Sequence, residues 1–289
     1  QVIQVAERDS QTDYRQVMPG EFRNTWSVPG FLSELTQACE AGWGSHETAL
    51  PNRAEYPSCE SSAGIYWHHP ENGLTQVKSW VPTVGDSLAR LITHNESISL
   101  AEFLTVRDAQ GQLQYRPTVY FAYQPCPPAG QSIAHWLHQH KQAPAAQNVM
   151  PLAHLQEGQD ELGVLLCHRT GAYWYGSTLT LQAARHLAPH NSATTLQVAA
   201  GIVGALVWML DLDALAKTEG ENWVWSRVSV FKTRAMISLS RGGADATVVR
   251  EFDMTLEQIV SKFVYKGQRY GAPDWSVVSP QIKNSYDLN

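Results

Sequence analysis

The sequence predicts an α+β fold in which helices pack on a mixed sheet. Three observations support this class across the 289 residues. Short β-branched and aromatic segments recur, many of them alternating between apolar and polar residues. Clusters of Pro, Gly, Asn and Asp separate these segments, and longer stretches with helix caps lie between them. The balance of 43% hydrophobic and 17% charged residues is ordinary for a globular protein and excludes disorder, coiled coil and collagen.

The first half of the chain contains most of the expected strands. Residues 2–6 alternate and predict a strand that delivers Glu7, Arg8 and Asp9 to its end. Residues 31–38 predict a short helix. Residues 63–67 and 75–80 predict a hairpin around the turn-forming residues 70–73. A strand over 91–96 is expected to end in a polar tip, and two further strands are expected over 100–107 and 114–123, joined by a turn at 108–111.

The second half of the chain contains most of the expected helices. Helices are predicted over residues 131–140, 180–188 and 192–210, the last of them central and buried because it contains many small residues. Residues 142–151 predict an exposed loop and 162–167 a strand. Beyond residue 210, strands are expected over 228–238 and 246–252, and a capping box predicts a helix over 255–263.

Charge and histidine divide the chain near residue 210. All of the net charge of −6 lies in residues 1–210, and none of the 11 histidines lies beyond His190. We therefore expect a domain over residues 1–210 and a separate tail over 211–289. The acidic surplus argues against a nucleic-acid partner and would suit a cationic ligand, although a mildly acidic soluble enzyme would show the same surplus.

Several site classes are not indicated by the sequence. Cys39, Cys59, Cys126 and Cys167 are widely spaced, which favours reduced thiols and a cytoplasmic protein. The longest apolar run, about 198–212, is short and interrupted for a membrane span, and no signal-like N-terminus is present. No glycine-rich nucleotide motif occurs. Three histidines follow one another in the helix over 131–140, but only two of them share a face, so we expect no metal site.

Two segments interleave tryptophan with carboxylates. They are residues 21–27 and 40–47, which contain Trp26 and Trp43. An indole ring attracts an ammonium or iminium group, and neighbouring carboxylates neutralise and orient that cation. On the residues alone, a buried structural tryptophan with acids at the surface is the simpler interpretation.

Five motifs together resemble bacterial homospermidine synthase. They appear in the expected order, and the similarity runs from residue 1 to about 210. The motifs are VIQVAERD (2–9), EFRNTWS (21–27), GWGSHE (42–47), LITHNE (91–96) and GAYWYGS (171–177). The resemblance places the chain among saccharopine dehydrogenase-like proteins. It implies that residues 1–210 form the domain that binds the amine substrate and makes dimer contacts, after an N-terminal Rossmann domain that binds NAD.

The resemblance also implies an activity and a set of site residues. The activity is an NAD-dependent aminobutyl transfer from putrescine that releases ammonia and forms homospermidine. By motif, Trp26 would hold the cationic amine or iminium, and Glu7 and Glu34 would bind ammonium groups. His94 and Glu96 would complete a catalytic pocket, with His94 as the proton shuttle. The implied partners are polyamines and a second copy of the chain, without nucleic acid or membrane.

Two departures from this family pattern define the alternatives. The Rossmann domain is missing from the sequence, so we expect a fragment that is inactive alone. Residues beyond Leu210 do not follow the family and faintly resemble a phage portal or head-to-tail connector protein, mainly over 250–260. The alternatives are therefore a polyamine-binding or oligomerisation module without catalysis, and a chimera with a phage structural protein.

Overall fold

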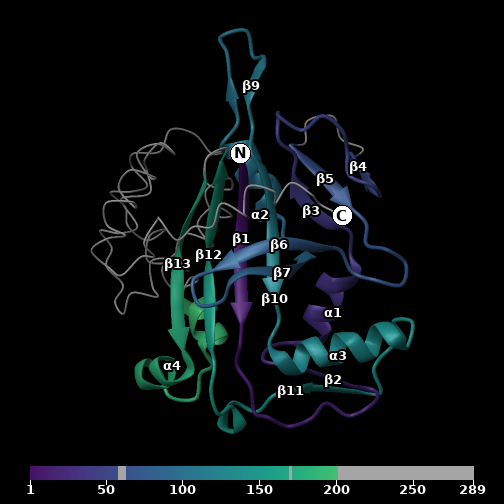
Figure 1. Cartoon of the computed structure of the whole chain (residues 1–289), viewed down its shortest axis with the longest axis vertical. Coiled ribbons are helices and arrows are strands. Elements are labelled where there is room, and N and C mark those ends of the chain that lie inside the picture. Colours follow the sequence, from purple (N-terminus) through teal and green to yellow (C-terminus); the bar gives the residue numbers. More distant parts are fainter. Residues whose placement is uncertain (58–62, 169–170, 201–289) are drawn as a thin grey trace.

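The computed structural model describes residues 1–57, 63–168 and 171–200 (Figure 1). The elements expected beyond residue 210, most of the helix over 192–210 and the domain division itself lie outside these residues. The portal-like segment does so too, and these expectations stay predictions.

A mixed sheet forms the centre of the described structure. Its main path runs β13 (Gly171–Thr180), β12 (Gln159–His168), β1 (Val2–Asp9), β10 (Thr118–Gln124), β3 (Cys39–Gly42), β5 (Gly64–Trp67) and β4 (Ala54–Glu55). β7 (Gly85–Ile92) pairs with both β10 and β6 (Gln76–Val81). β1 runs parallel to β10 and antiparallel to β12. The first strand of the chain therefore lies between two strands from its later part.

The remaining elements surround this sheet. The helices are α1 (Val28–Thr36), α2 (Glu96–Phe103), α3 (Pro127–His138), the short 3-10 helix η1 (Leu152–His154), α4 (Leu181–Leu187) and a helical segment over 193–200. Two small sheets pair β2 (Glu21–Asn24) with β11 (Ala146–Val149) and β8 (Val106–Arg107) with β9 (Leu113–Tyr115). The β8–β9 hairpin projects from one end of the molecule (Figure 1).

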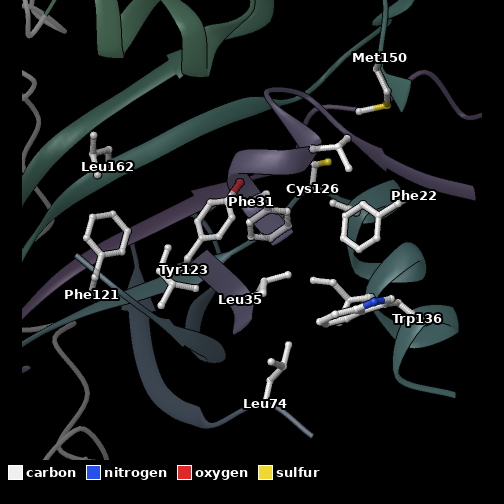
Figure 2. Close-up of a cluster of buried hydrophobic side chains, with 14 of the residues drawn as sticks. Phe22, Phe31, Leu35, Leu74, Phe121, Tyr123, Cys126, Trp136, Met150 and Leu162 are labelled. Atoms are coloured by element: carbon white, nitrogen blue, oxygen red, sulfur yellow. The ribbon is translucent and has the colours of Figure 1, made fainter. Parts of the chain in front are cut away.

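The two faces of the sheet are buried by different elements. On one face, Tyr120 and Ala122 of β10 pack with residues of the β6–β7 hairpin, which crosses over the sheet (Figure 1). On the other face, Phe121 and Tyr123 of the same strand pack with Phe31 and other side chains from α1 and α3. Figure 2 shows this second cluster, in which the Phe31 and Tyr123 rings meet edge to face with centroids 5.5 Å apart. Because successive side chains of β10 point to opposite faces of the sheet, this strand contributes residues to both hydrophobic cores.

The structure confirms the predicted fold class and corrects several local predictions. The predicted strand over 100–107 is wrong over its first half, which lies in α2, and only its end forms the short strand β8. β7 ends at Ile92, so that Glu96 opens α2 instead of ending a strand. The strands near 63–67 and 75–80 exist but do not form a hairpin, since β5 pairs with β3 and β4 whereas β6 pairs with β7. The predicted exposed loop over 142–151 contains β11, and β13 was not expected as a strand.

The position of α2 has a packing cause that no local pattern reveals. Gly42 of β3 and Gly64 of β5 carry no side chain where α2 crosses them, so the helix approaches the sheet closely. A Cβ atom on Gly42 would lie 2.6 Å from the Ser97 carbonyl oxygen and would also collide with Ala101, while one on Gly64 would lie 2.6 Å from Ile98. These two glycines therefore determine where α2 lies on the sheet.

Candidate functional site

A cavity of about 440 Å³ opens on the sheet face that α1 covers. Strand residues of β1, β7, β10 and β12 form part of its wall, and α1, α2 and the helical segment over 193–200 contribute the rest. It is lined by Val5, Glu7, Trp26, Ser27, Glu34, Ile92, His94, Glu96, Phe121, Tyr123, Leu162, Thr194, Thr195, Val198 and Ala199. We call this space the acidic cavity. Its side chains combine three carboxylates and an imidazole with apolar and aromatic surface.

Trp26 stands at the entrance to α1, where the chain leaves β2. Ser27 caps the helix by accepting a hydrogen bond from the Gly30 amide at 3.2 Å, which fixes the backbone beside the indole. The indole Nε1 donates to the Tyr123 hydroxyl at 3.1 Å, and the Trp26 ring centroid lies 5.1 Å from that of Phe31. Trp26 is half-buried and lines the acidic cavity, whereas Trp43 is buried in the opposite core. Trp43 is thus a buried core residue, whereas Trp26 packs against the core and also lines the acidic cavity.

His94 lies between two carboxylates. Its Nδ1 is 2.9 Å from Glu96 Oε1, and its Nε2 is 3.9 Å from Glu34 Oε2. The imidazole stacks on Phe121 with ring centroids 4.0 Å apart and an interplanar angle of 17°. Glu96 is almost fully buried, while Glu34 keeps 29% of its side chain exposed. An imidazole held in this way can pass a proton between the cavity and a buried acid.

Glu7 faces the acidic cavity from the centre of the sheet. Alternation along β1 puts it on the same face as Val5 and Asp9, and its cross-strand partner is Leu162. Tyr123, on the neighbouring strand, is fully buried. Burial raises the pKa of this phenol well above its usual value, and the nearby Asp9 and Glu7 carboxylates raise it further. Tyr123 therefore stays neutral and can donate a hydrogen bond.

A second pair of acids lies directly behind the wall of the acidic cavity. Asp9 and Asp160 are cross-strand neighbours and almost completely buried. Burial is the largest cause that raises the pKa of each, and for Asp160 the Glu7 and Asp9 charges raise it further. Thr194, which lines the acidic cavity, is 3.4 Å from Asp9 Oδ2.

The structure brings the expected site residues together. Glu7, Trp26, Glu34, His94 and Glu96 come from separate parts of the chain and all line the acidic cavity. Sequence reasoning missed Tyr123, Thr194 and Asp160, whose positions depend on strand pairing and helix packing. Asp9 is the last residue of the first motif, and its spacing of two residues from Glu7 indicated that both side chains lie on the same face of the sheet.

The described ranges show neither a cluster of metal ligands nor a membrane-spanning helix. No group of three or more His, Cys, Asp and Glu side chains there is arranged to hold a metal ion. None of the helices in those ranges is long and apolar enough to cross a membrane.

Comparison with known proteins gives the family. A model of the saccharopine dehydrogenase C-terminal domain matches residues 4–220. The chain belongs to the saccharopine dehydrogenase C-terminal domain family. Within this family, homospermidine synthase of Mesorhizobium japonicum is 43% identical over 226 residues, which are 78% of this chain and 46% of that protein. Homospermidine synthase of Blastochloris viridis is 43% identical over 210 residues, 72% of this chain and 44% of that protein.

A solved structure from the same family supports the fold. The crystal structure of homospermidine synthase from Legionella pneumophila in complex with NAD superposes with a TM-score of 0.68 at 40% identity. The match covers 82% of this chain and 51% of that one. The chain thus spans about half the length of the relatives that it matches.

Proposed function

We propose that the acidic cavity binds a linear diamine of the putrescine type, as the amine-binding part of a homospermidine synthase. One observation carries the proposal. The five side chains that the family resemblance assigns to the site line a single cavity, in a chain 43% identical to two homospermidine synthases. A diamine has a charge at each end and an apolar middle, so separated carboxylates with aromatic surface between them suit it.

The proposed reaction of the whole enzyme is an aminobutyl transfer. An amine-bearing carbon of putrescine is oxidised to an imine, a second amine displaces ammonia, and reduction of the new imine gives homospermidine. NAD, when bound, accepts and returns the hydride. The sequence contains no glycine-rich turn for a dinucleotide pyrophosphate, and we assign no step of NAD chemistry to the residues described.

Each cavity residue has a role in this proposal. Glu7 and Glu34 bind the ammonium ends of the substrate, and the Trp26 ring covers the cationic nitrogen near the reacting carbon. Before oxidation the reacting ammonium must lose a proton. His94 accepts that proton while its other ring nitrogen remains hydrogen-bonded to Glu96 at 2.9 Å.

Titration calorimetry of the chain with putrescine tests the binding proposal. We expect saturable binding of putrescine and none of 1,4-butanediol, which has the same length without the charges. Binding combined with ammonia release on addition of NAD would favour a complete catalyst. Binding without ammonia release is expected both of an enzyme fragment that is inactive alone and of a non-catalytic polyamine-binding module. Equal heats for the diol and the diamine would refute a site built for cations.

Glu7→Gln is expected to weaken putrescine binding by about tenfold or more, because a hydrogen bond to a charged group contributes about 1.5–3 kcal/mol. The glutamine keeps the shape of the side chain, so the unfolding temperature should change little. Glu55→Gln is the matched control, since Glu55 is an exposed acid outside the acidic cavity. If both variants lost affinity equally, the effect would come from net charge and not from the position of Glu7.

A homodimer remains a prediction of the family resemblance. Light scattering coupled to size-exclusion chromatography would test it, and a monomer at tens of micromolar protein would contradict it.

A further inference from the structure

Asp9 and Asp160 form a close pair of acids on the cavity side of the sheet. They lie directly opposite each other in the antiparallel β1–β12 ladder, next to the Glu7–Leu162 pair. Opposite residues in such a ladder have Cβ atoms roughly 4.5–5.5 Å apart and point to the same face. The relative exposures are 2% for Asp9 and 1% for Asp160. Two buried carboxylates this close together do not both ionise readily.

The two acids have different hydrogen-bond environments. Asp9 accepts hydrogen bonds from the Gln11 amide at 2.8 Å, from Gln11 Nε2 at 3.0 Å and from the Thr25 hydroxyl at 2.5 Å. Asp160 Oδ1, in contrast, has no hydrogen-bond partner among the described residues. An array of donors stabilises a carboxylate, whereas an oxygen without a donor is better tolerated in a neutral acid. The geometry therefore places the negative charge on Asp9 and the proton on Asp160.

Thr194 connects this pair to the acidic cavity. Its hydroxyl accepts a hydrogen bond from Gln11 Nε2 at 3.0 Å and lies 3.4 Å from Asp9 Oδ2. Thr194 is also close enough to the Asp160 carboxyl to lower its pKa, against the larger effect of burial. The same residue lines the acidic cavity. Thr194 therefore contacts Asp9 on one side and the acidic cavity on the other, so that a cation in the cavity and the acid pair can interact across one side chain.

The groups that face the pair are mainly acidic or neutral. Glu7, on β1, adds a negative charge on the same face as the pair. Glu161, on β12, points to the other face and forms an ion pair with Arg8 at 3.2 Å. Tyr123 and Cys126 lie on the Asp9 side, and burial raises the pKa of both well above their usual values. They therefore remain neutral. From the other packed elements, the pair meets Leu179 of β13 and Thr194 and Gln197 of the helical segment, none of which titrates.

We propose that Asp9 and Asp160 hold one proton between them in the empty protein, and that this proton leaves to solvent when a diamine enters the acidic cavity. This inference rests on the proposed function. The incoming positive charge stabilises the second carboxylate, and ionisation of the pair in turn supplies one more negative charge beside the substrate. Asp160 is thus a positioning residue that acts through Thr194 and adjusts the charge of the cavity to that of its ligand.

The sign of the resulting pH dependence follows from linkage. The pair loses its proton at lower pH in the complex than in the empty protein. Between these two pKa values, binding releases one proton, so the affinity for putrescine rises about tenfold per pH unit. Below both values the pair stays protonated in either state, and the dependence disappears.

Calorimetry at a series of pH values, each in two buffers that differ in ionisation enthalpy, measures the proton directly and covers the window between the two pKa values. With putrescine as the probe, we expect release of about one proton per bound diamine. Asp160→Asn should bind without proton release, whereas His94→Gln should retain it, which separates the acid pair from the histidine. Glu55→Gln is the control acid and should behave as the unmodified chain does.

The unmodified chain alone can overturn the inference. Equal binding heats in the two buffers would mean that no proton is exchanged, whether or not the Asp160→Asn protein folds. Unchanged proton release in folded Asp160→Asn would assign the proton to another group and would also overturn it. Absence of any putrescine binding would instead refute the proposed function, which is a different result from binding without proton release.

Discussion

Trp26→Ala is expected to reduce putrescine affinity by about 30-fold or more while the protein remains folded. A cation on an indole face that is shielded from water is stabilised by about 2 kcal/mol or more, and the substitution removes that surface from the acidic cavity. The loss of stability should be smaller than for a core tryptophan, because Trp26 is half-buried and contacts the aromatic cluster only with part of its ring. In an intact enzyme of this family, the same change should lower the rate far more than the stability.

Trp26→Phe distinguishes the contribution of the aromatic ring from that of the indole hydrogen bond. It keeps an aromatic face for the cation but loses the 3.1 Å bond to Tyr123, so its affinity should fall between those of the unmodified chain and Trp26→Ala. Calorimetry gives the affinities and thermal denaturation gives the stabilities. A large fall in unfolding temperature together with unchanged affinity would show that Trp26 is a structural residue.

Gly42→Ala is expected to lower both stability and putrescine affinity, although Gly42 does not line the acidic cavity. A Cβ atom at this position would lie 2.6 Å from the Ser97 carbonyl oxygen, which is backbone and cannot rotate away. Forcing a methyl group into such a contact costs typically 1–3 kcal/mol of unfolding free energy. The helix α2 must move outward, and Glu96, its first residue, moves with it. The hydrogen bond that orients His94 should then lengthen, and affinity should fall by roughly tenfold.

Gly130→Ala is the matched control for this prediction. Gly130 lies in α3, and a Cβ atom there would meet nothing within 4 Å. Alanine in a helix interior is favoured over glycine by roughly 0.5–1 kcal/mol, so this variant should be as stable as the unmodified chain or more so. If Gly42→Ala proved equally harmless in denaturant unfolding, the close contact between α2 and β3 would not be what places Glu96.

The sequence was sufficient to predict the fold class and to name five residues whose side chains line one cavity, while their roles remain predictions. Glu7, Trp26, His94 and Glu96 lie in short motifs that can be read directly from the sequence, and the family resemblance added Glu34 and implied that all five residues serve one site. The strand β1 was also predicted well, because its alternation is a local property.

Features that arise from long-range contacts could not be predicted in this way. The second half of α2 was expected as part of a strand over 100–107, whereas two glycines from distant strands decide where this helix packs. The Asp9–Asp160 pair is defined only by the register of β1 against β12. Nothing in the composition of either segment indicates that these two carboxyl groups meet.

The position of β1 also bears on how the protein folds during synthesis. Val2 pairs with Thr118 on one side and with Cys167 on the other, so β1 finds its partners only after most of the described chain has been made. Such distant pairings raise the contact order and slow folding, because the entropy cost of closing a long loop must be met before the stabilising contacts form. Until then β1, with its apolar and β-branched residues, is an unpaired strand that other chains could capture. The acidic cavity, whose wall includes Glu7, can therefore form only late in folding, and newly made chains are expected to benefit from a chaperone that shields β1 until its partner strands are made.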